Sequence, residues 1–316
     1  MNVQDVKKVG VVGSGVMGHG IAINSAVWGY PTMMHDVNDE ILQKAMKGIN
    51  STLDIFIQAG LIDQKRKNET LAKITTTTDL EKLARQSDFI TEAIVERSED
   101  KRILFKKLDE MCPPQTILAS NTSSLVLSDF GRDVKRQDKL IVTHYFSPPA
   151  IVPGVEVAKG PGSTDETFNV TCELMKKWYK VPIKILKEKP GYLINRLQQA
   201  LQREAMLLWA EGVASAEDID IGQRTTMGYR MPMEGSLARY DYAGLYRWPK
   251  DVLANMADLM LDGISQPTPE TRQKIKERQA SGKPWFIDPN KFDEEVKPLY
   301  LDYAQRLKGK YWPTGK

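Results

Sequence analysis

The sequence predicts an α/β fold, with a doubly wound parallel sheet over residues 1–188 and a mainly α-helical domain over residues 189–316. Short apolar runs alternate with helical patterns through the first part, and parallel strands need such crossover helices. A glycine-rich turn follows the first apolar run, and almost nothing beyond the Pro190–Gly191 break is typical of a strand. The length of 316 residues allows two domains with separate cores.

The first apolar strand leads directly into a glycine-rich turn and a helix. Gly13, Gly15 and Gly18 have the spacing of the dinucleotide fingerprint. The first glycine permits a tight turn, the second lets the backbone approach a pyrophosphate, and the third lets the helix pack on the strand. Val16 and Met17 lie where free N–H groups at a helix start bind phosphate oxygens. The pattern indicates a Rossmann-type domain; the alternative is a glycine-rich turn that binds no ligand.

An acidic residue follows the second predicted strand. Residues 30–35 form this strand, and Asp36 comes directly after it, 18 residues beyond Gly18. A carboxylate in this position accepts hydrogen bonds from the adenosine ribose hydroxyls and repels a 2′-phosphate. The sequence therefore predicts NAD, rather than NADP, as the cofactor.

The sheet continues through predicted strands at residues 74–78, 89–95 and 116–120, after two helices joined by a turn at Gly60. Ligands of such sheets bind at the carboxyl ends of the strands. Glu96, the run Asn121–Ser124 and His144 should therefore share one rim of the sheet. The alternative for the Asn-Thr-Ser-Ser run is a helix cap.

A histidine and a glutamate stand on either side of a turn rich in proline. The apolar strand 140–142 leads to His144, and a second short strand carries Glu156. If the strands lie side by side, the carboxylate reaches the imidazole, fixes its tautomer and stabilises its protonated form. The alternative is a structural histidine beside an unrelated surface glutamate. Of the three histidines, His19 lies in the glycine loop and His35 precedes the ribose-binding acid, which leaves His144 for proton transfer.

The composition excludes several classes of protein. With 44 basic and 41 acidic residues, the net charge of +3 is too balanced for nucleic-acid binding. No apolar segment approaches the length of a membrane span, and no signal region is seen at the start. Cys112 and Cys172 form no recognisable metal-binding pattern with the histidines, so we expect no metal, reduced cysteines and a cytoplasmic protein.

The second domain begins with a long apolar-faced helix over residues 192–210, and Ser215 caps the next helix. The long helix is compatible with a dimer interface. The charged tail, residues 293–316, is expected to form an exposed helix that ends in a loose segment.

These residues together resemble the 3-hydroxyacyl-CoA dehydrogenase superfamily over nearly the whole chain. The motifs that carry the resemblance are Gly13–Gly18 with Asp36, Glu92–Glu96, Ala119–Ser124, His144–Glu156 and Pro190–Arg196. The resemblance implies that His144 is the general base, that Glu156 orients it, and that the substrate oxygen is held by Ser123 and Asn195. It also implies cofactor contacts from Glu96 and Lys101. The predicted cofactor site thus comprises Gly13, Gly15, Val16, Met17, Gly18, Asp36, Glu96, Lys101 and Asn121.

Some residues depart from the acyl-CoA pattern. Ser147 replaces an asparagine, and residues 51–59 lack the lysines that face the CoA phosphates in acyl-CoA members, although Lys65–Lys67 follow soon after. The segment 228–237 resembles the branch that contains L-gulonate 3-dehydrogenase (lambda-crystallin) and L-carnitine dehydrogenase. That branch has an arginine at the position of Arg230, and an arginine can clamp a small free carboxylate. The alternative is a surface arginine paired with Glu234 or Asp241.

The sequence therefore predicts a homodimeric, NAD-dependent dehydrogenase that oxidises the 3-hydroxyl of a small free 3-hydroxy acid to the 3-oxo acid. The alternative is an L-3-hydroxyacyl-CoA dehydrogenase of the 3-hydroxybutyryl-CoA type. A catalytically idle binding protein is a third reading, which the presence of every predicted catalytic residue argues against.

Overall fold

The computed structural model describes residues 2–243, 247, 249–252, 267–281, 285–286, 288 and 290–313. The chain divides into two compact units, of which the first comprises residues 1–195 and 287–316 and the second residues 196–286. Each unit is considered by itself below. None of the helices in the described part of the chain is long and apolar enough to cross a membrane.

The first unit is built on an eight-stranded sheet with the order β3-β2-β1-β4-β5-β6-β7-β8. The strands are β1 (Val9–Val12), β2 (Thr32–His35), β3 (Ile74–Thr77), β4 (Phe89–Glu92), β5 (Ile117–Ser120), β6 (Leu140–Tyr145), β7 (Gly154–Ala158) and β8 (Val181–Ile185). Only the β6–β7 pair is antiparallel. The strand order reverses at β1, whose neighbours are β2 and β4, so the glycine-rich turn after β1 opens at the switch point where such sheets bind ligands.

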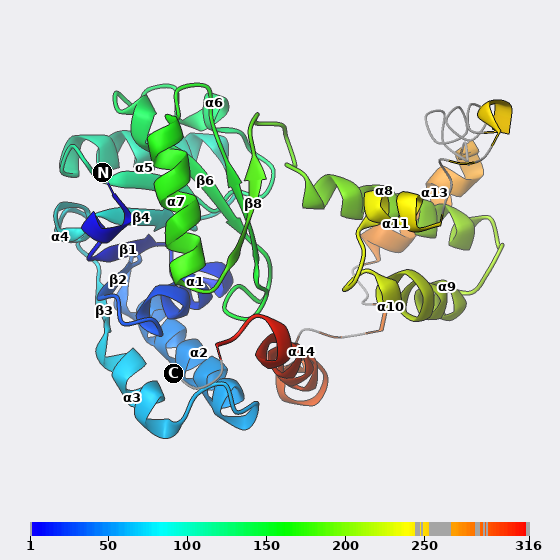
Figure 1. Cartoon of the computed structure of the whole chain (residues 1–316), viewed down its shortest axis with the longest axis horizontal. Coiled ribbons are helices and arrows are strands. Elements are labelled where there is room, and N and C mark those ends of the chain that lie inside the picture. Colours follow the sequence, from blue (N-terminus) through cyan, green and yellow to red (C-terminus); the bar gives the residue numbers. More distant parts are fainter. Residues whose placement is uncertain are drawn as a thin grey trace. The chain divides into compact units, whose positions relative to one another are not determined.

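Helices cover both faces of this sheet (Figure 1). They are α1 (Val16–Ala26), α2 (Asp39–Gln58), α3 (Gln64–Ala72), α4 (Leu80–Gln86), α5 (Ser98–Met111), α6 (Leu127–Phe130) and α7 (Asp165–Lys177). One buried core contains side chains of α1, α2 and α7, and the other contains side chains of α4, α5 and α6. Strand β1 contributes to both cores, with Val11 in the first and Val12 in the second, because successive strand residues point to opposite faces.

The second unit is helical in its described part, as the sequence predicts. Its helices are α8 (Ile194–Ala210), which begins in the first unit, α9 (Ala216–Gly222), a π-helical turn (Gln223–Met227), α10 (Gly228–Arg230), α11 (Ser236–Tyr242) and α13 (Pro269–Ala280). Helix α8 begins two residues later than expected. Gly191 and Tyr192 have φ angles of 74° and 46°, which right-handed helix does not allow. The hydroxyl of Ser215 caps α9 by accepting from the N–H of Asp218.

The carboxyl-terminal segment differs from the expected exposed tail. Helix α14 (Lys297–Lys310) buries Ala304 and Leu307 in the core that contains α2. Beyond it, the indole N–H of Trp312 donates to the carbonyl oxygen of Leu61 at 2.8 Å, and its ring packs edge-on against Phe56. Residues 287–316 therefore cluster with the first unit, whereas the predicted domain boundary grouped them with residues 189–286. The apolar contacts of a few tail residues outweigh the charged average of the segment.

Candidate active site

Gly13 and Gly18 of the nucleotide-binding turn have no room for a side chain, whereas Gly15 borders open space. A Cβ atom on Gly13 would lie 2.6 Å from the carbonyl oxygen of Ala93, and one on Gly18 would lie 1.7 Å from the carbonyl oxygen of Gly13. A Cβ on Gly15 would meet nothing within 4 Å. Helix α1 starts at Val16 without a side-chain cap, so its first N–H groups face this space. The turn thus fits a pyrophosphate.

Asp36 closes the same turn from the end of β2. Its Oδ2 atom accepts from the backbone N–H of Ser14 at 2.7 Å and from the Ser14 hydroxyl at 2.9 Å, and its Oδ1 atom accepts from the N–H of Val37. A cleft of about 310 Å³ beside it is lined by Val37, Ile94 and Lys107, among others. A carboxylate accepts about four hydrogen bonds, so Asp36 can also bind ribose hydroxyls. The cleft fits the adenosine half of NAD.

The other two histidines have structural positions. The Nδ1 atom of His19 lies 2.8 Å from the carbonyl oxygen of Gly15, and burial lowers the pKa of His19. Burial also lowers the pKa of His35, although the Asp36 carboxylate opposes this effect. Neither imidazole is hydrogen-bonded to a carboxylate in the part of the chain that the structure describes. Among these residues, neither therefore has a carboxylate that would stabilise a protonated ring by a hydrogen bond.

His144 and Glu156 lie directly opposite one another on β6 and β7. The Nδ1 atom of His144 is 2.7 Å from Oε2 of Glu156, and the residues are only 4% and 0% exposed. The other oxygen, Oε1, accepts from the N–H groups of Leu193 and Ile194 at the start of α8, at 3.0 and 2.7 Å. Because an ionised carboxylate only accepts, Nδ1 carries the proton, and Nε2 has the free lone pair.

Two aromatic rings flank the imidazole. The ring centroid of Phe146 lies 4.5 Å from that of His144, and the ring centroid of Tyr192 lies 6.0 Å from it. The Tyr192 hydroxyl donates to the carbonyl oxygen of Leu125, which fixes the ring from its far end. None of the described residues forms a hydrogen bond with Nε2 of His144. The imidazole is therefore held by its Nδ1 side and by apolar contacts, with Nε2 available to a substrate.

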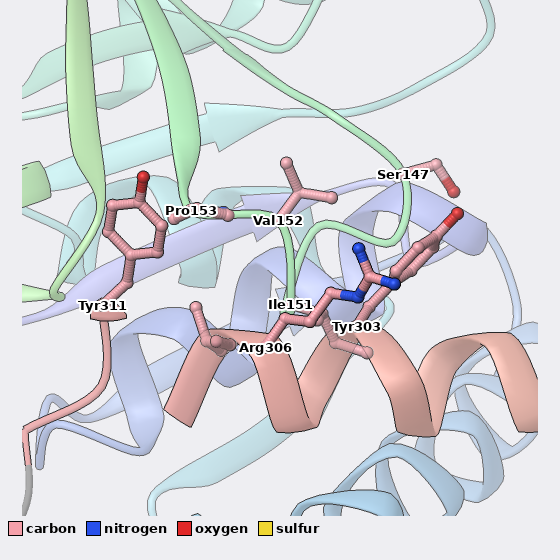
Figure 2. A pocket seen from close by; sticks show the side chains of 8 residues that line it. Ser147, Ile151, Val152, Pro153, Tyr303, Arg306 and Tyr311 are labelled. Carbon is pink, nitrogen blue, oxygen red and sulfur yellow. The ribbon is translucent and has the colours of Figure 1, made fainter. Parts of the chain in front are cut away.

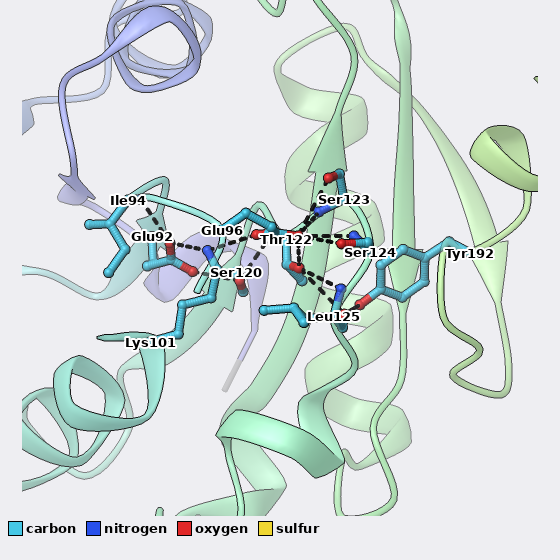
Figure 3. A network of polar contacts seen from close by, with 10 residues as sticks. All are labelled: Glu92, Ile94, Glu96, Lys101, Ser120, Thr122, Ser123, Ser124, Leu125 and Tyr192. Atoms are coloured by element: carbon cyan, nitrogen blue, oxygen red, sulfur yellow. Dashed lines mark hydrogen bonds and ion pairs between the residues drawn. The ribbon is translucent and has the colours of Figure 1, made fainter. Parts of the chain in front are cut away.

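Glu96 organises the loop after β5 (Figure 3). Its Oε1 atom accepts from the Thr122 hydroxyl at 2.6 Å and from the N–H groups of Ser123 and Ser124 at 2.9 and 3.0 Å. Burial by itself raises the pKa of Glu96, but the Thr122 hydroxyl, the Lys101 ammonium and two backbone N–H groups together lower it to about 2. The Asn-Thr-Ser-Ser run thus encloses a carboxylate; α6 begins after Val126 without a side-chain cap.

Lys101 is buried beside Glu96. Its side chain is 1% exposed, and Nζ lies 2.6 Å from Oε1 of Glu92 and 3.2 Å from Oε2 of Glu96. Glu92, at the end of β4, also accepts from the Ser120 hydroxyl at 2.6 Å. Figure 3 shows the ammonium enclosed between the two carboxylates. Lys101 thus neutralises Glu92 and orients Glu96, and its contact with the cofactor stays a prediction.

The remaining predicted residues of the first unit meet at the same rim. The side-chain Nδ2 of Asn195 donates to the carbonyl oxygen of Ser123 at 3.0 Å, and Asn195 follows Ile194, whose N–H binds Glu156. The Oδ1 atom of Asn121 accepts from the N–H of Tyr145, next to His144. Hydrogen bonds thus link the loops after β4, β5 and β6 to the start of α8. The rim that the sequence predicts is present.

Arg230 belongs to the second unit, on α10. Its Nε atom lies 3.9 Å from Oε1 of Glu234, and Arg239 approaches the same oxygen at 3.1 Å. This is one of the pairings that the sequence leaves open, and its long distance leaves the guanidinium able to bind another anion. The part of Arg230 in substrate binding stays a prediction.

Two residues of the site are not predicted from the sequence. The backbone N–H groups of Leu193 and Ile194 bind Glu156. Almost every residue type has a backbone N–H group, so the sequence does not show which of these groups binds a side chain. The Pro190–Gly191 break before an apolar helix is the only local signal that a helix start lies there, because a helix start has free N–H groups.

Comparison with known proteins identifies the family. Residues 8–189 match the family model described as 3-hydroxyacyl-CoA dehydrogenase, NAD binding domain, and residues 191–285 match that of its C-terminal domain. The human mitochondrial hydroxyacyl-coenzyme A dehydrogenase is 33% identical over 280 residues, which cover 87% of this chain and 88% of that protein. The 3-hydroxybutyryl-CoA dehydrogenase of Clostridioides difficile is 37% identical over 238 residues, which cover 75% of this chain and 83% of that protein.

A solved structure agrees with these matches. The crystal structure of the (S)-3-hydroxybutyryl-CoA dehydrogenase from Ralstonia eutropha has a TM-score of 0.69 and 31% sequence identity, and the match covers 88% of this chain and 94% of that one. The glycine turn, Asp36 and the adjoining cleft fit the NAD that such enzymes use. The chain belongs to the 3-hydroxyacyl-CoA dehydrogenase family and is an NAD-dependent oxidoreductase.

Proposed function

We propose that His144 is the general base that removes the hydroxyl proton of a 3-hydroxy substrate during its oxidation to the 3-oxo product. The observation that carries the proposal is the buried contact of 2.7 Å between Nδ1 of His144 and Glu156. Bound NAD supplies the hydride acceptor. As Nε2 takes the proton, the ring becomes an imidazolium, and the carboxylate behind it stabilises the new charge.

The substrate oxygen is held, in this proposal, by Ser123 and Asn195. The Ser123 hydroxyl is 3.4 Å from Oε1 of Glu96, a distance at which it is only weakly engaged. Asn195 donates to the Ser123 carbonyl oxygen, which fixes its side chain on the backbone of Ser123. Both groups can therefore donate to the oxygen from which His144 removes the proton. Negative charge that develops on this oxygen is stabilised by such donors.

We propose a small free 3-hydroxy acid as the substrate, with Arg230 binding its carboxylate. The support is the state of the three basic residues 65–67, which follow α2. Lys67 lies 2.6 Å from Asp54 of α2, and Arg66 lies 3.8 Å from Glu69. Of the three basic residues at 65–67, two thus have acidic neighbours, and only Lys65 is both exposed and without an ion pair among the described residues. A 3′-phospho-ADP group needs several free cations.

A 3-hydroxyacyl-CoA thioester is the second candidate. The human and C. difficile relatives, which are 33% and 37% identical, are both named as CoA dehydrogenases. Exposed ion pairs such as that of Lys67 contribute little energy and can exchange for a phosphate. The two candidates differ in which cations bind the substrate, and this difference can be measured.

The test is NADH formation on matched substrates: 3-hydroxybutyrate, L-gulonate and L-carnitine against 3-hydroxybutyryl-CoA. Each is assayed with the wild type, with Arg230→Ala and with the control Arg239→Ala, since both arginines neighbour Glu234. We expect turnover of a free acid, with a KM that rises about 10- to 100-fold in Arg230→Ala only, as for the loss of a charged hydrogen bond. Turnover of the thioester alone, indifferent to Arg230, would show that the substrate assignment is wrong.

We also propose that the protein is a homodimer, which the family resemblance implies. In the second unit Leu197, Tyr229, Met233 and Leu237 are exposed apolar side chains. Sedimentation velocity should give a mass near twice the monomer mass of 35.7 kDa. A monomer at micromolar concentration would contradict the proposal.

A further inference from the structure

The turn that joins His144 to Glu156 has few backbone N–H donors of its own. Residues 146–153 include three prolines, which have no N–H group. Their carbonyl oxygens still need partners when buried. Only part of this need is met within the turn, where the carbonyl oxygen of Pro148 accepts from the N–H groups of Ile151 and Val152, both at 3.0 Å.

A single lysine donates hydrogen bonds to three further carbonyl oxygens of the turn. The Nζ atom of Lys180 donates to the carbonyl oxygens of Pro149, Ala150 and Val152 at 2.8, 3.2 and 3.0 Å. Lys180 lies between α7 and β8, is 6% exposed, and forms no ion pair with any carboxylate of the described residues. Burial lowers its pKa to about 7. An ammonium has three donors, and all three bind this one turn.

The turn also rests directly on the helix that starts at the glycine loop. The Nδ2 atom of Asn24 on α1 donates to the carbonyl oxygen of Pro149 at 3.0 Å, so Asn24 and Lys180 share one acceptor. A Cβ atom on Gly20 of α1 would lie 2.6 Å from Cγ of Pro149, which shows how closely the helix and the turn approach. The position of the turn is therefore tied to the helix whose amino end faces the proposed pyrophosphate site.

Packing on another side of the turn is incomplete. Figure 2 shows Ile151, Val152 and Pro153 of the turn near Tyr303 and Arg306 of α14. A cavity of about 280 Å³ lies between them. Ile151 is nevertheless buried in the same core as Leu307 of α14, so apolar packing holds this side of the turn without hydrogen bonds. Outside this side, the turn accepts hydrogen bonds from Lys180, from Asn24 and from the backbone N–H of Val181, which donates to the carbonyl oxygen of Pro153 at 2.8 Å.

We propose that Lys180 is a positioning residue for catalysis, which holds the turn from the α7–β8 connection while Asn24 holds it on α1, and which thereby fixes His144 relative to the glycine loop. The proposal rests on the proposed role of His144 as the base. A base displaced by about 1 Å costs roughly 100-fold in rate while cofactor binding persists. The ammonium thus acts on turnover through the backbone of the turn, without touching the substrate.

The test compares Lys180→Met with Lys177→Met, a control that removes an exposed lysine from the end of α7. The wild type and both variants are assayed for kcat, for the Kd of NADH and for hydrogen exchange of the segment 145–156. Turnover is measured with 3-hydroxybutyrate or 3-hydroxybutyryl-CoA, whichever the wild type oxidises. We expect kcat to fall about 10- to 100-fold in Lys180→Met, with faster exchange in the turn and an unchanged Kd. The control should match the wild type.

Asn24→Ala provides a milder variant in case Lys180→Met does not fold. It removes one donor to the Pro149 carbonyl oxygen and should give the same pattern to a smaller degree, and the effects of the two changes on kcat should be non-additive. Unchanged kcat, or unchanged exchange in the turn, would overturn the proposal. Failure of the proposed function is a separate result, because it would be seen as normal turnover in His144→Ala.

Discussion

Glu156 and Glu96 lie at the same rim of the sheet. Both accept backbone hydrogen bonds, but their side-chain partners differ. Each accepts from two backbone N–H groups, Glu156 at the start of α8 and Glu96 in the loop after β5. The remaining oxygen of Glu156 faces a titratable imidazole, whereas that of Glu96 faces the ammonium of Lys101. The first arrangement can support movement of a proton, and the second fixes the conformation of a loop.

The largest expected effect comes from removing the imidazole that distinguishes the two glutamates. His144→Ala should lower kcat by roughly 10²–10⁴-fold, the usual contribution of general base catalysis. NADH binding, followed by its fluorescence, should stay unchanged, since His144 takes no part in the glycine turn. Normal turnover in this variant would mean that another group is the base.

Glu156→Gln tests whether the charge behind the imidazole matters. Glutamine keeps the volume but replaces one acceptor oxygen with a donor, and a hydrogen bond to a charged group contributes about 1.5–3 kcal/mol. We therefore expect kcat to fall about 10- to 100-fold, together with a lower midpoint of thermal unfolding. Glu96→Gln, assayed alongside, should lose less than a factor of about 10 in kcat. Equal losses of turnover in both variants would show that Glu156 and Glu96 do not differ in their contribution to catalysis.

Asp36→Ala extends the comparison to a carboxylate at the cofactor end of the sheet. Asp36 holds Ser14 and has capacity for ribose hydroxyls, so the KM for NAD should rise about 10-fold with little change in kcat. Steady-state kinetics with varied NAD measures both constants, and Asp39→Ala, an exposed neighbour, is the control. A fall in kcat at saturating NAD would place Asp36 nearer to the chemistry than we propose.

The smallest effect is on acid stability. The pKa of Glu96 is lowered from 4.5 to about 2, so its ionised form stabilises the folded protein fully above about pH 4.5, and this contribution is lost as the pH falls toward 2. Glu96→Gln should therefore be less stable at pH 7 and less sensitive to pH between 4.5 and 2. Urea unfolding at several pH values measures this, with the exposed Glu69→Gln as the control. Identical pH slopes for Glu96→Gln and the wild type would contradict the assignment.

The sequence predicts local structure well where a residue type has a local cause. Gly13 and Gly18 are needed for steric reasons within one turn, and the pairing of His144 with Glu156 follows from two strands and a tight connection. Sequence reasoning fails where the cause is spatial. Lys180 belongs to no motif quoted from the sequence, yet its ammonium binds three carbonyl oxygens about 30 residues earlier in the chain.

By itself, the sequence determined the α/β fold, the helical second unit, the family, the NAD cofactor and the rim on which the candidate catalytic residues lie. These follow from patterns of apolar residues, glycines and motifs that are local in the chain. Tertiary structure alone decided that Lys101 is buried between Glu92 and Glu96, that the charged tail packs in the core of the first unit, and that Lys180 binds the turn between His144 and Glu156. The physical reason is that burial and hydrogen-bond partners depend on distant segments, and residue type does not specify which segments will meet.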